Sequence, residues 1–239
     1  MSAQTKTESG PRLALVTGAS SGIGAACAAA LAAAGWSLVL QGRDAERTEA
    51  AGQRARTLGP EAEVCLADLA VDDDVARLAA SIDGRPLHAL VHAAGLIRLG
   101  RVADLDTAAL DAHYALNLRA PYALTRALLR NLRDAGGHVV FVNSGAGRQA
   151  KARWSAYAAS KFALRALADA LREEEDALRV TSVYPGRTAT PMQEAVRAAE
   201  GAAYEPSAFV QPEAVAAQIV ALLDLPRPSL VAELIIRPG

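Results

Sequence analysis

Cysteine is rare in this sequence of 239 residues, which contains only Cys27 and Cys65. Two cysteines so far apart are too few for a disulfide framework or a zinc site, and each lies in an apolar stretch that suits a buried thiol. His88, His113 and His138 show no spacing typical of metal ligands, so we expect no metal. Free thiols are typical of a reducing compartment, and we therefore expect a cytoplasmic protein.

An excess of charge of either sign is also missing. The chain has 25 Lys and Arg residues against 26 Asp and Glu residues, for a formal net charge of −1. A balanced chain has no overall field that would attract nucleic acid or an anionic membrane. We therefore expect a small-molecule partner, with no nucleic acid and no membrane.

No apolar run is long enough to cross a membrane. The most apolar stretch covers residues 22–40, but Gly35 and Trp36 interrupt it after about three and a half helical turns, too few for a bilayer of ~30 Å. Residues 1–11 are polar and lack the apolar core of a secretory signal, so they are predicted to form a disordered tail. Because no repeat or linker divides the rest, we expect one domain over residues 12–239.

Short apolar runs alternate with longer helical patterns along the whole chain, and 51% of the residues are hydrophobic. This alternation predicts a doubly wound α/β fold with a seven-stranded parallel sheet and helices on both faces. The predicted strands are residues 13–17, 37–41, 63–67, 89–92, 138–143, 180–184 and 230–236. The predicted helices are residues 23–34, 45–58, 73–82, 107–135, 156–177 and 212–223.

Residues 186–207 interrupt the alternation because they are rich in Ala, Thr, Pro and Gly and have weak periodicity. A loop of this kind after a strand is a candidate substrate lid. An ordinary surface excursion is the alternative.

A glycine-rich turn, TGASSGIG, follows the first predicted strand and leads into the first helix. Gly18 permits a tight turn, Gly22 lets the backbone approach a pyrophosphate, and Gly24 lets the helix pack close to the sheet. The helix that starts near Ile23 directs free N–H groups and its positive dipole end at the phosphate. The motif predicts a Rossmann-like dinucleotide site, in which Ser20 and Ser21 also lie at the cofactor.

The second predicted strand ends in LQGRDAER, near the expected position of the adenosine ribose. An acidic residue there would bind the ribose hydroxyl of NAD, whereas this chain has Arg43. A guanidinium binds a 2′-phosphate, so Arg43 favours NADP(H) as the cofactor. A solvated arginine at the start of the next helix is the alternative.

Tyr157 and Lys161 are four residues apart at the start of a long helical pattern, which puts both side chains on one helix face. Ser144 follows the strand HVVFVN, at the end of the sheet where ligands of open α/β folds bind. A Tyr and a Lys at this spacing can also be a surface pair. Together with the glycine turn and Ser144, they favour a catalytic group.

With these motifs the sequence resembles the short-chain dehydrogenase/reductase family over nearly its whole length. TGASSGIG resembles the cofactor turn of that family, and Asp68 in LADL resembles its adenine-binding acid. Asn117 in ALNLRAPYALT resembles its active-site Asn. The resemblance therefore implies a catalytic tetrad of Asn117, Ser144, Tyr157 and Lys161, and it implies that Tyr157 and Lys161 also contact the cofactor.

The segment YPGRTATPM resembles the part of the family that flanks the nicotinamide. The resemblance thus implies further cofactor contacts at Ala94, Gly95, Pro185, Gly186, Thr188 and Thr190. One departure is visible after the fourth strand, where the family usually has Asn-Asn-Ala-Gly and this chain has HAAG. The change puts in doubt how that strand is braced, and His92 is predicted to be a structural replacement rather than a catalyst.

The resemblance implies an oxidoreductase that moves a hydride between NADP(H) and a carbonyl or secondary alcohol. Such a reaction needs an acid/base and a donor that holds the substrate oxygen, which Tyr157 and Ser144 would supply. A phenol has a reference pKa of ~10, and we expect Lys161 and the oxidised nicotinamide to lower the pKa of Tyr157. By resemblance, Lys161 also holds the nicotinamide ribose and Asn117 orders a water in a proton relay.

Two other functions stay open. A 3-oxoacyl thioester reductase would favour a basic patch at the pocket mouth, for which the candidates are Arg148, Lys151, Arg153 and Arg187. A solvated basic loop would explain these four residues as well. A catalytically idle NADP-binding regulatory protein would usually lack the acid/base residue that this chain retains. The resemblance also implies a homo-oligomer, a tetramer or dimer, with the Ala-rich helices around Asn117 and Tyr157 as interfaces.

Overall fold

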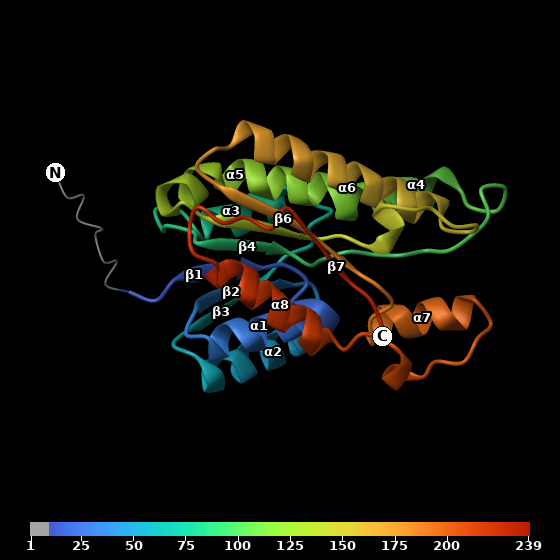
Figure 1. Ribbon diagram of the computed structural model, residues 1–239, viewed down its shortest axis with the longest axis horizontal. Coiled ribbons are helices and arrows are strands. Elements are labelled where there is room, and N and C mark those ends of the chain that lie inside the picture. Colours follow the sequence, from blue (N-terminus) through green and yellow to red (C-terminus); the bar gives the residue numbers. More distant parts are fainter. Residues whose placement is uncertain (1–9) are drawn as a thin grey trace.

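The computed structural model describes residues 10–239, so the predicted tail lies almost entirely outside the described residues. Seven parallel strands form one sheet in the order β3-β2-β1-β4-β5-β6-β7 (Figure 1). The strands are β1 (Leu13–Val16), β2 (Ser37–Gly42), β3 (Ala62–Leu66), β4 (Ala89–His92), β5 (His138–Val142), β6 (Arg179–Pro185) and β7 (Glu233–Ile236). The predicted seven-stranded parallel sheet is confirmed.

Helices cover both faces of the sheet (Figure 1). One face carries α1 (Gly22–Ala33), α2 (Ala45–Leu58) and α8 (Pro212–Asp224); the other carries α3 (Asp72–Ala80), α4 (Thr107–Tyr114), α5 (Ala120–Ala135) and α6 (Ser155–Glu174). Strand β1 illustrates the cause, because Ala14 and Val16 pack into the core on the α1 side while Leu13 and Leu15 pack on the α5 side. A strand buried on both faces needs apolar residues at every position.

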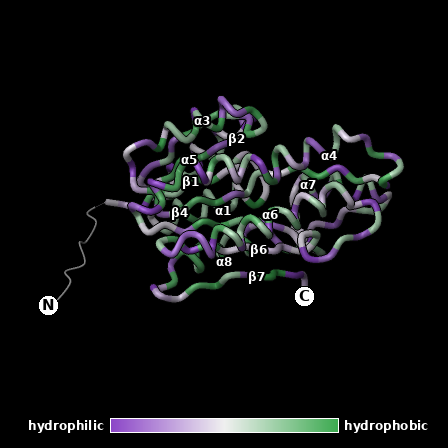
Figure 2. Tube along the Cα trace, turned by 90° about the horizontal axis from the view of Figure 1, so that it is seen from above, coloured by the Kyte–Doolittle hydropathy of each residue, from purple (hydrophilic) through white to green (hydrophobic). Residues whose placement is uncertain are grey.

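The strand order reverses beside β1, which pairs with β2 on one side and β4 on the other. Connections leave in opposite directions at such a point, so a crevice opens at the carboxyl ends of these strands. Helices α4 and α7 (Pro191–Ala199) lie at the same end of the molecule in both views (Figures 1 and 2). Within residues 10–239, no helix combines the length and the apolar character that a membrane-spanning segment needs.

The helix predicted over residues 107–135 is wrong in one respect: it is not a uniform α-helix. Between α4 and α5 it widens into a π-helical turn, Ala115–Arg119. Pro121 explains the change, since it has no N–H to bond to the carbonyl of Asn117, its partner four residues back in an α-helix. Turns of this kind often occur at functional sites.

The segment 186–207 was predicted to be irregular, but it contains helix α7. Thr190 caps this helix, with its Oγ1 accepting a hydrogen bond from the Gln193 backbone N–H at 3.2 Å, and Pro191 occupies the first turn. At the base, Thr188 pairs with Val210 in an isolated β-bridge. Strand β7 is also shorter than predicted, because it begins at Glu233.

Candidate active site

A cleft of about 950 Å³ opens at the carboxyl ends of the strands. It brings together residues that the sequence predicts for both catalysis and cofactor binding. Those that line it are Gly18, Ser20, Ser21, Gly22, Ile23, Arg43, Ala94, Gly95, Ser144, Tyr157, Lys161, Pro185, Gly186, Thr188 and Thr190. Gly24, Asp68 and Asn117 do not line the cleft, and each contacts a residue that does.

The glycine turn has space for no other residue type at its key positions. Gly18 has a φ of +68°, and a Cβ there would lie 2.8 Å from the Ala94 Cα. A Cβ on Gly24 would overlap the carbonyl oxygen of Gly18, which explains why Gly24 supports the turn from beneath rather than lining the cleft. A backbone with no side chains in front can approach a phosphate closely.

Two buried polar residues that the sequence reasoning missed hold this turn. The Gln41 Oε1 accepts a hydrogen bond from the Gly18 N–H at 3.0 Å, and its Nε2 donates to the Ala67 carbonyl at 2.7 Å. The Thr17 Oγ1 accepts hydrogen bonds from the backbone N–H groups of Ala93 and Ala94, both at 3.1 Å. A glutamine inside an otherwise apolar strand was the available signal, since a buried amide requires partners.

Arg43 lies at the rim of the cleft, just past β2. Its side chain is 65% exposed, and its Nη1 is 3.8 Å from the Asp68 Oδ2. An exposed ion pair of this kind contributes little to stability. The guanidinium is therefore available to a ligand at the rim, although its exposure also fits a solvated side chain.

Tyr157 is buried in the first turn of α6, with 7% of its surface exposed. The rings of His113 and Trp154 meet it edge-on, with centroids 6.2 Å and 5.9 Å away. Burial raises the pKa of Tyr157, and a hydrogen bond with the Ser144 side chain opposes that rise. These contacts hold the phenol in its protonated form beside Ser144.

Lys161 is also buried, one turn further along α6. Its Nζ donates a hydrogen bond to the Val142 carbonyl at 3.0 Å and lies 5.9 Å from the centroid of the Tyr157 ring. Burial lowers the pKa of Lys161 to about 8. Tyr157 and Lys161 thus share one helix face, as their spacing predicts.

Asn117 lies outside the cleft lining and contacts the residues that support it. Its Oδ1 accepts a hydrogen bond from the Leu96 N–H at 2.9 Å, while its Nδ2 donates to the Leu96 carbonyl at 3.1 Å and to the Ser160 Oγ at 3.0 Å. The Ser160 hydroxyl in turn donates to the Tyr157 carbonyl at 2.7 Å. Asn117 therefore ties the segment after β4 to the helix that carries Tyr157.

Asn143 and His113 are further positioning residues that the sequence reasoning missed. The Asn143 Oδ1 accepts a hydrogen bond from the Ser144 N–H at 2.8 Å, and its Nδ2 donates to the Lys161 carbonyl at 3.1 Å. The His113 Nε2 accepts from the Arg98 N–H at 3.0 Å, and its Nδ1 lies 2.6 Å from the Ala109 carbonyl. One partner of each residue is distant in sequence, Lys161 for Asn143 and Arg98 for His113, so a local pattern could not have identified these contacts.

Most of the basic loop is engaged within the chain. Arg148 pairs with Glu233 at 2.5 Å, and Arg153 donates to the Ala199 carbonyl at 3.1 Å. Arg187 donates two hydrogen bonds to Glu200, at 2.7 Å and 2.8 Å, which lower the pKa of that carboxyl. Of the four predicted candidates, only Lys151 and Arg187 line the main cleft.

His92 lies outside the cleft lining. Its Nε2 is 2.8 Å from the Thr125 Oγ1, and its ring stacks on Phe141 with centroids 5.0 Å apart. Burial lowers the pKa of His92 to about 3. These contacts brace the end of β4, and the prediction of a structural role agrees with them.

Comparison with known proteins gives consistent similarities. A family model described as short chain dehydrogenase matches residues 12–201. A sepiapterin reductase of Chlorobaculum tepidum is 34% identical over 236 residues, covering 94% of this chain and 95% of that protein. An uncharacterized short-chain type dehydrogenase/reductase of Sinorhizobium fredii is 34% identical over 221 residues, covering 90% and 86%.

Solved structures extend the similarity to three dimensions. A metagenomic short-chain oxidoreductase in complex with NADP is 33% identical, with a TM-score of 0.82 and coverage of 96% of this chain and 98% of that one. An alcohol dehydrogenase of Thermococcus sibiricus complexed with 5-hydroxy-NADP is 26% identical, with a TM-score of 0.87 and coverage of 95% and 96%. On the family match and the length over which these relatives align, the chain belongs to the short-chain dehydrogenase family of oxidoreductases.

Proposed function

We propose that this protein transfers a hydride between NADP(H) and a carbonyl or secondary alcohol, with Tyr157 as the proton-transfer residue. One observation carries the proposal: Tyr157, Ser144 and Lys161 line the same cleft as the glycine turn. Similarity to the alcohol dehydrogenase of Thermococcus sibiricus and to the metagenomic oxidoreductase, whose structures hold an NADP analogue and NADP, supports this choice of cofactor and chemistry.

The cleft fits a dinucleotide. Because Gly18 and Gly22 present bare backbone at its floor and α1 begins there, a pyrophosphate would meet N–H groups and a positive helix end. Arg43 at the rim would bind a 2′-phosphate. We assign the remaining contacts to residues that line the cleft or adjoin it: Ser20, Ser21, Ile23, Asp68, Ala94, Gly95, Lys161, Pro185, Gly186, Thr188 and Thr190. When bound, NADPH would supply the hydride.

The chain's own residues would manage the proton. The raised pKa of Tyr157 keeps its hydroxyl protonated, which is the form that carbonyl reduction needs, because the developing alkoxide takes that proton. Ser144 would hold the same oxygen with a hydrogen bond, and the Lys161 ammonium would stabilise the phenolate that remains. Burial raises the pKa of Tyr157, and the hydrogen bond with Ser144 opposes that rise. The lowering that we expect from Lys161 and the oxidised nicotinamide together belongs to the cofactor complex.

A route for returning the proton begins at Asn117. Its side chain is fully used in holding Leu96 and Ser160, but Pro121 cannot donate to its backbone carbonyl. We assign to that carbonyl the water of the proton relay that the family resemblance implies, because residue 121 cannot be its α-helical donor.

The test of the reaction is Tyr157→Phe. The variant keeps the ring that packs on Trp154 but loses the hydroxyl, so we expect kcat to fall by roughly 10²–10⁴-fold while NADPH still binds. Tyr122→Phe, on an exposed tyrosine of α5, is the matched control and should change nothing. NADPH consumption would be screened across ketones, aldehydes, hydroxy acids and β-keto thioesters. Substantial turnover by Tyr157→Phe would refute the assignment.

Cofactor preference would be tested with Arg43→Ala. Loss of a charged hydrogen bond to the 2′-phosphate should weaken NADPH binding by about 10–100-fold and leave NADH binding nearly unchanged. Arg47→Ala is the comparison, because Arg47 also lines the cleft and has a similar exposed ion pair with Asp44. A selective loss of NADPH binding in Arg47→Ala instead of Arg43→Ala would assign the 2′-phosphate to Arg47. Equal losses of affinity for NADPH and NADH would show that Arg43 does not bind the 2′-phosphate.

The other two functions gain no support from the site. The thioester reductase would favour a basic patch at the mouth. Arg148 and Arg187 are held by Glu233 and Glu200, so Lys151 is the candidate that the cleft leaves for it. An idle regulator requires a missing acid/base residue, and the screen above would detect its lack of turnover.

We also propose a homo-oligomer. Large apolar side chains remain exposed on α4, α5 and α6, the helices that the sequence predicts as interfaces: Leu110, Tyr114, Tyr122 and Phe162. Contiguous exposed apolar groups are typical of interfaces. Light scattering on the purified protein should give a dimer or tetramer mass, and Phe162→Asp should reduce it.

The cytoplasm remains our proposed compartment. Cys27 and Cys65 are both free thiols, and burial raises the pKa of Cys27 to about 12. The fold therefore gains nothing from an oxidising environment. Cell fractionation with an activity assay would test the proposal.

A further inference from the structure

Gln193 carries a buried amide that its own chain does not satisfy. The residue lies in the first turn of α7, only 8% exposed, and lines the cleft. Among residues 10–239, no group accepts a hydrogen bond from its Nε2. Leaving a buried donor unpaired is costly, so such a group usually has a ligand or a special role.

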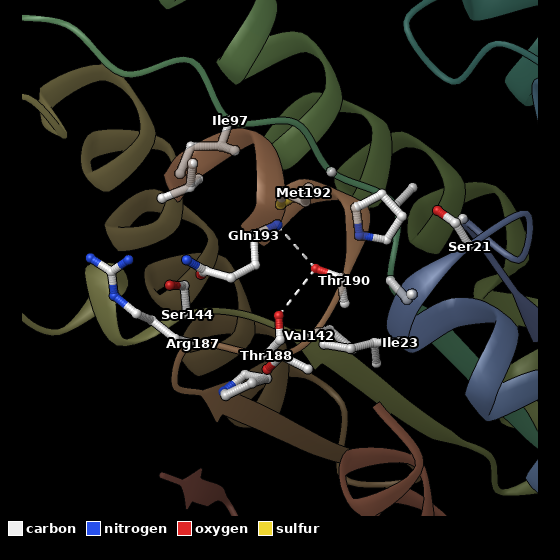
Figure 3. A pocket seen from close by; sticks show the side chains of 18 of the residues that line it. Ser21, Ile23, Ile97, Val142, Ser144, Arg187, Thr188, Thr190, Met192 and Gln193 are labelled. Carbon is white, nitrogen blue, oxygen red and sulfur yellow. Dashed lines mark hydrogen bonds between the residues drawn. The ribbon is translucent and has the colours of Figure 1, made fainter. Parts of the chain in front are cut away.

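The position of Gln193 is fixed by its backbone. Its N–H donates to the Thr190 Oγ1 at 3.2 Å, and that hydroxyl lies 3.3 Å from the Thr188 carbonyl to which it donates. Figure 3 shows both hydrogen bonds and shows the amide end of Gln193 directed toward Ser144. The unpaired amide is therefore aimed at the place where the reacting oxygen would be held.

The cleft that Gln193 lines contains many apolar side chains. They include Ile97, Ala146, Trp154, Met192, Val196 and Phe209, while Gln149, Lys151 and Arg187 are polar members of the same lining. A substrate seated there needs an apolar body, and few of its polar atoms would find partners. A buried amide in a cleft discriminates between substrates, because a substrate that cannot accept its hydrogen bond leaves the amide unpaired and binds more weakly.

Charge at this end of the cleft is already balanced. Arg187 lines the cleft, but its guanidinium donates to both oxygens of Glu200, whose Oε2 also lies 3.2 Å from Arg197. The Trp154 ring lies 6.0 Å from the Arg187 guanidinium carbon. A carboxylate on the substrate would have to compete with Glu200 for these donors, so an uncharged oxygen is the better partner for Gln193.

We propose that Gln193 determines specificity by donating a hydrogen bond to a second, uncharged oxygen on the carbon next to the reacting carbonyl. The substrate class would be α-hydroxy ketones and vicinal diketones with an apolar remainder. The inference rests on the proposed function, since Ser144 and Tyr157 must hold the reacting oxygen. We place the oxygen on the neighbouring carbon beside the Gln193 amide, because Figure 3 shows that amide directed toward Ser144.

The first experiment compares matched ketones. The kcat/KM values of acetophenone, 2-hydroxyacetophenone and 1-phenyl-1,2-propanedione would be measured with NADPH for the parent, Gln193→Leu and Gln193→Met. Oxygenated ketones are intrinsically more reactive, so the informative quantity is the change in the ratio between oxygenated and plain ketone. We expect both variants to lower that ratio by about tenfold. Gln53→Leu, the same change at an exposed glutamine of α2 outside the cleft lining, should leave it unchanged.

Three outcomes would overturn the proposal. An unchanged ratio in both variants would show that the amide does not contact substrate. A fall in NADPH affinity with no change in the ratio would assign the amide to the cofactor. Preference of the parent for phenylglyoxylate over 2-hydroxyacetophenone, lost equally in both variants, would show that the amide serves an anionic substrate instead.

A binding experiment separates this inference from the proposed reaction. In a Tyr157→Phe background, the affinities of 1-phenyl-1,2-ethanediol and 1-phenylethanol would be measured by calorimetry with NADP⁺ present. The additional Gln193→Leu substitution should remove most of the preference for the diol, and an unaltered preference would overturn the inference. Retained turnover in Tyr157→Phe alone would instead contradict the proposed function, while the binding result for Gln193 would still stand.

Discussion

The two walls of the cleft are built in different ways. The glycine wall, residues 17–24 with residues 93–95 behind them, presents close-packed backbone to the cleft, so that a Cβ on Gly18 would lie 2.8 Å from the Ala94 Cα. The side chains of Thr17 and Gln41 support it with hydrogen bonds to backbone N–H groups. The helix wall, residues 186–210, is held by side chains such as Arg187 and Glu200. Close-packed backbone suits a ligand that is always the same, such as a cofactor. Side chains can be substituted without moving the backbone, so the helix wall can change its specificity for substrates.

The walls approach each other at one point. A Cβ on Gly22 would lie 3.0 Å from the Thr190 Cγ2, so the glycine wall and the helix wall are close to each other at these two residues. Thr190 also caps α7, so the residue that starts this helix is the one that faces Gly22. The following predictions test how different the walls really are.

Gly24→Ala should have the largest effect on stability. Its methyl group would overlap the Gly18 carbonyl oxygen, so we expect the free energy of unfolding to fall by about 3 kcal/mol and NADPH binding to be lost. Gly186→Ala is the matched change in the helix wall, where the nearest atoms are the Pro238 Cδ at 3.2 Å and the Ile236 carbonyl oxygen at 3.3 Å, and it should cost about 1 kcal/mol. Urea unfolding and NADPH titration would measure both. Equal costs would break the comparison.

Lys161→Met should separate activity from stability. We expect kcat to fall by about 10²-fold or more, while the free energy of unfolding at pH 7 rises by about 2 kcal/mol because a buried ammonium is removed. In the parent the pKa of Lys161 falls from 10.5 to about 8 on folding, so the unfolded chain binds more protons between these values.

The stability of the parent therefore increases as pH rises through this window. The advantage of Lys161→Met should shrink from pH 8 to pH 10.5, as measured by chemical denaturation at several pH values. A constant difference across the window would show that Lys161 is not buried as an ammonium. Lys151→Met, in the exposed loop, is the control.

His92 offers a pH test of the support beneath the glycine wall. Burial lowers its pKa from 6.5 to about 3, so the folded chain binds fewer protons than the unfolded chain between these values. Its contribution to stability is therefore present above pH 6.5 and is lost as the pH falls toward 3. His138 behaves in the same way, with a pKa lowered to about 3.

The free energy of unfolding of the parent should fall between pH 7 and pH 4.5. We expect this fall to be about 2 kcal/mol smaller in His92→Asn, which introduces the usual residue of the family at this position. Carboxylates contribute equally to parent and variant, so the difference between their denaturation curves isolates the histidine. Identical slopes would mean that His92 becomes charged without unfolding the chain.

The smallest effect is expected for the ion pair of the helix wall. Arg187 and Glu200 keep side-chain exposures of 32% and 20%, so screening limits their coupling to about 1 kcal/mol. A double-mutant cycle of Arg187→Gln and Glu200→Gln would measure it. We expect NADPH affinity to be unchanged in all three variants. A lower affinity would show that the helix wall and the glycine wall are energetically coupled.

Much of the glycine wall could be predicted because its information is local. The alternation of apolar runs predicts the parallel sheet, and the spacing of Gly18, Gly22 and Gly24 predicts the turn. Gly24 meets Gly18 nearby in the chain, whereas the fold alone brings Ala94 and Thr190 against Gly18 and Gly22. The pairing of Tyr157 with Lys161 follows from one helical turn. Arg43 was found by its place after β2, although its partner Asp68 is reached only through the fold.

The helix wall and the supports of the site could not be predicted in this way. Asn143 joins Ser144 to the helix of Lys161, Asn117 reaches Leu96 and Ser160, and Arg187 meets Glu200 only after α7 has formed. The sequence by itself determined the sheet, the glycine turn and the residues available for proton transfer, because periodicity and steric limits act over short stretches. Only the tertiary structure decided which polar groups remain unpaired in the cleft, because hydrogen bonding of a buried side chain depends on atoms that the chain brings from far away.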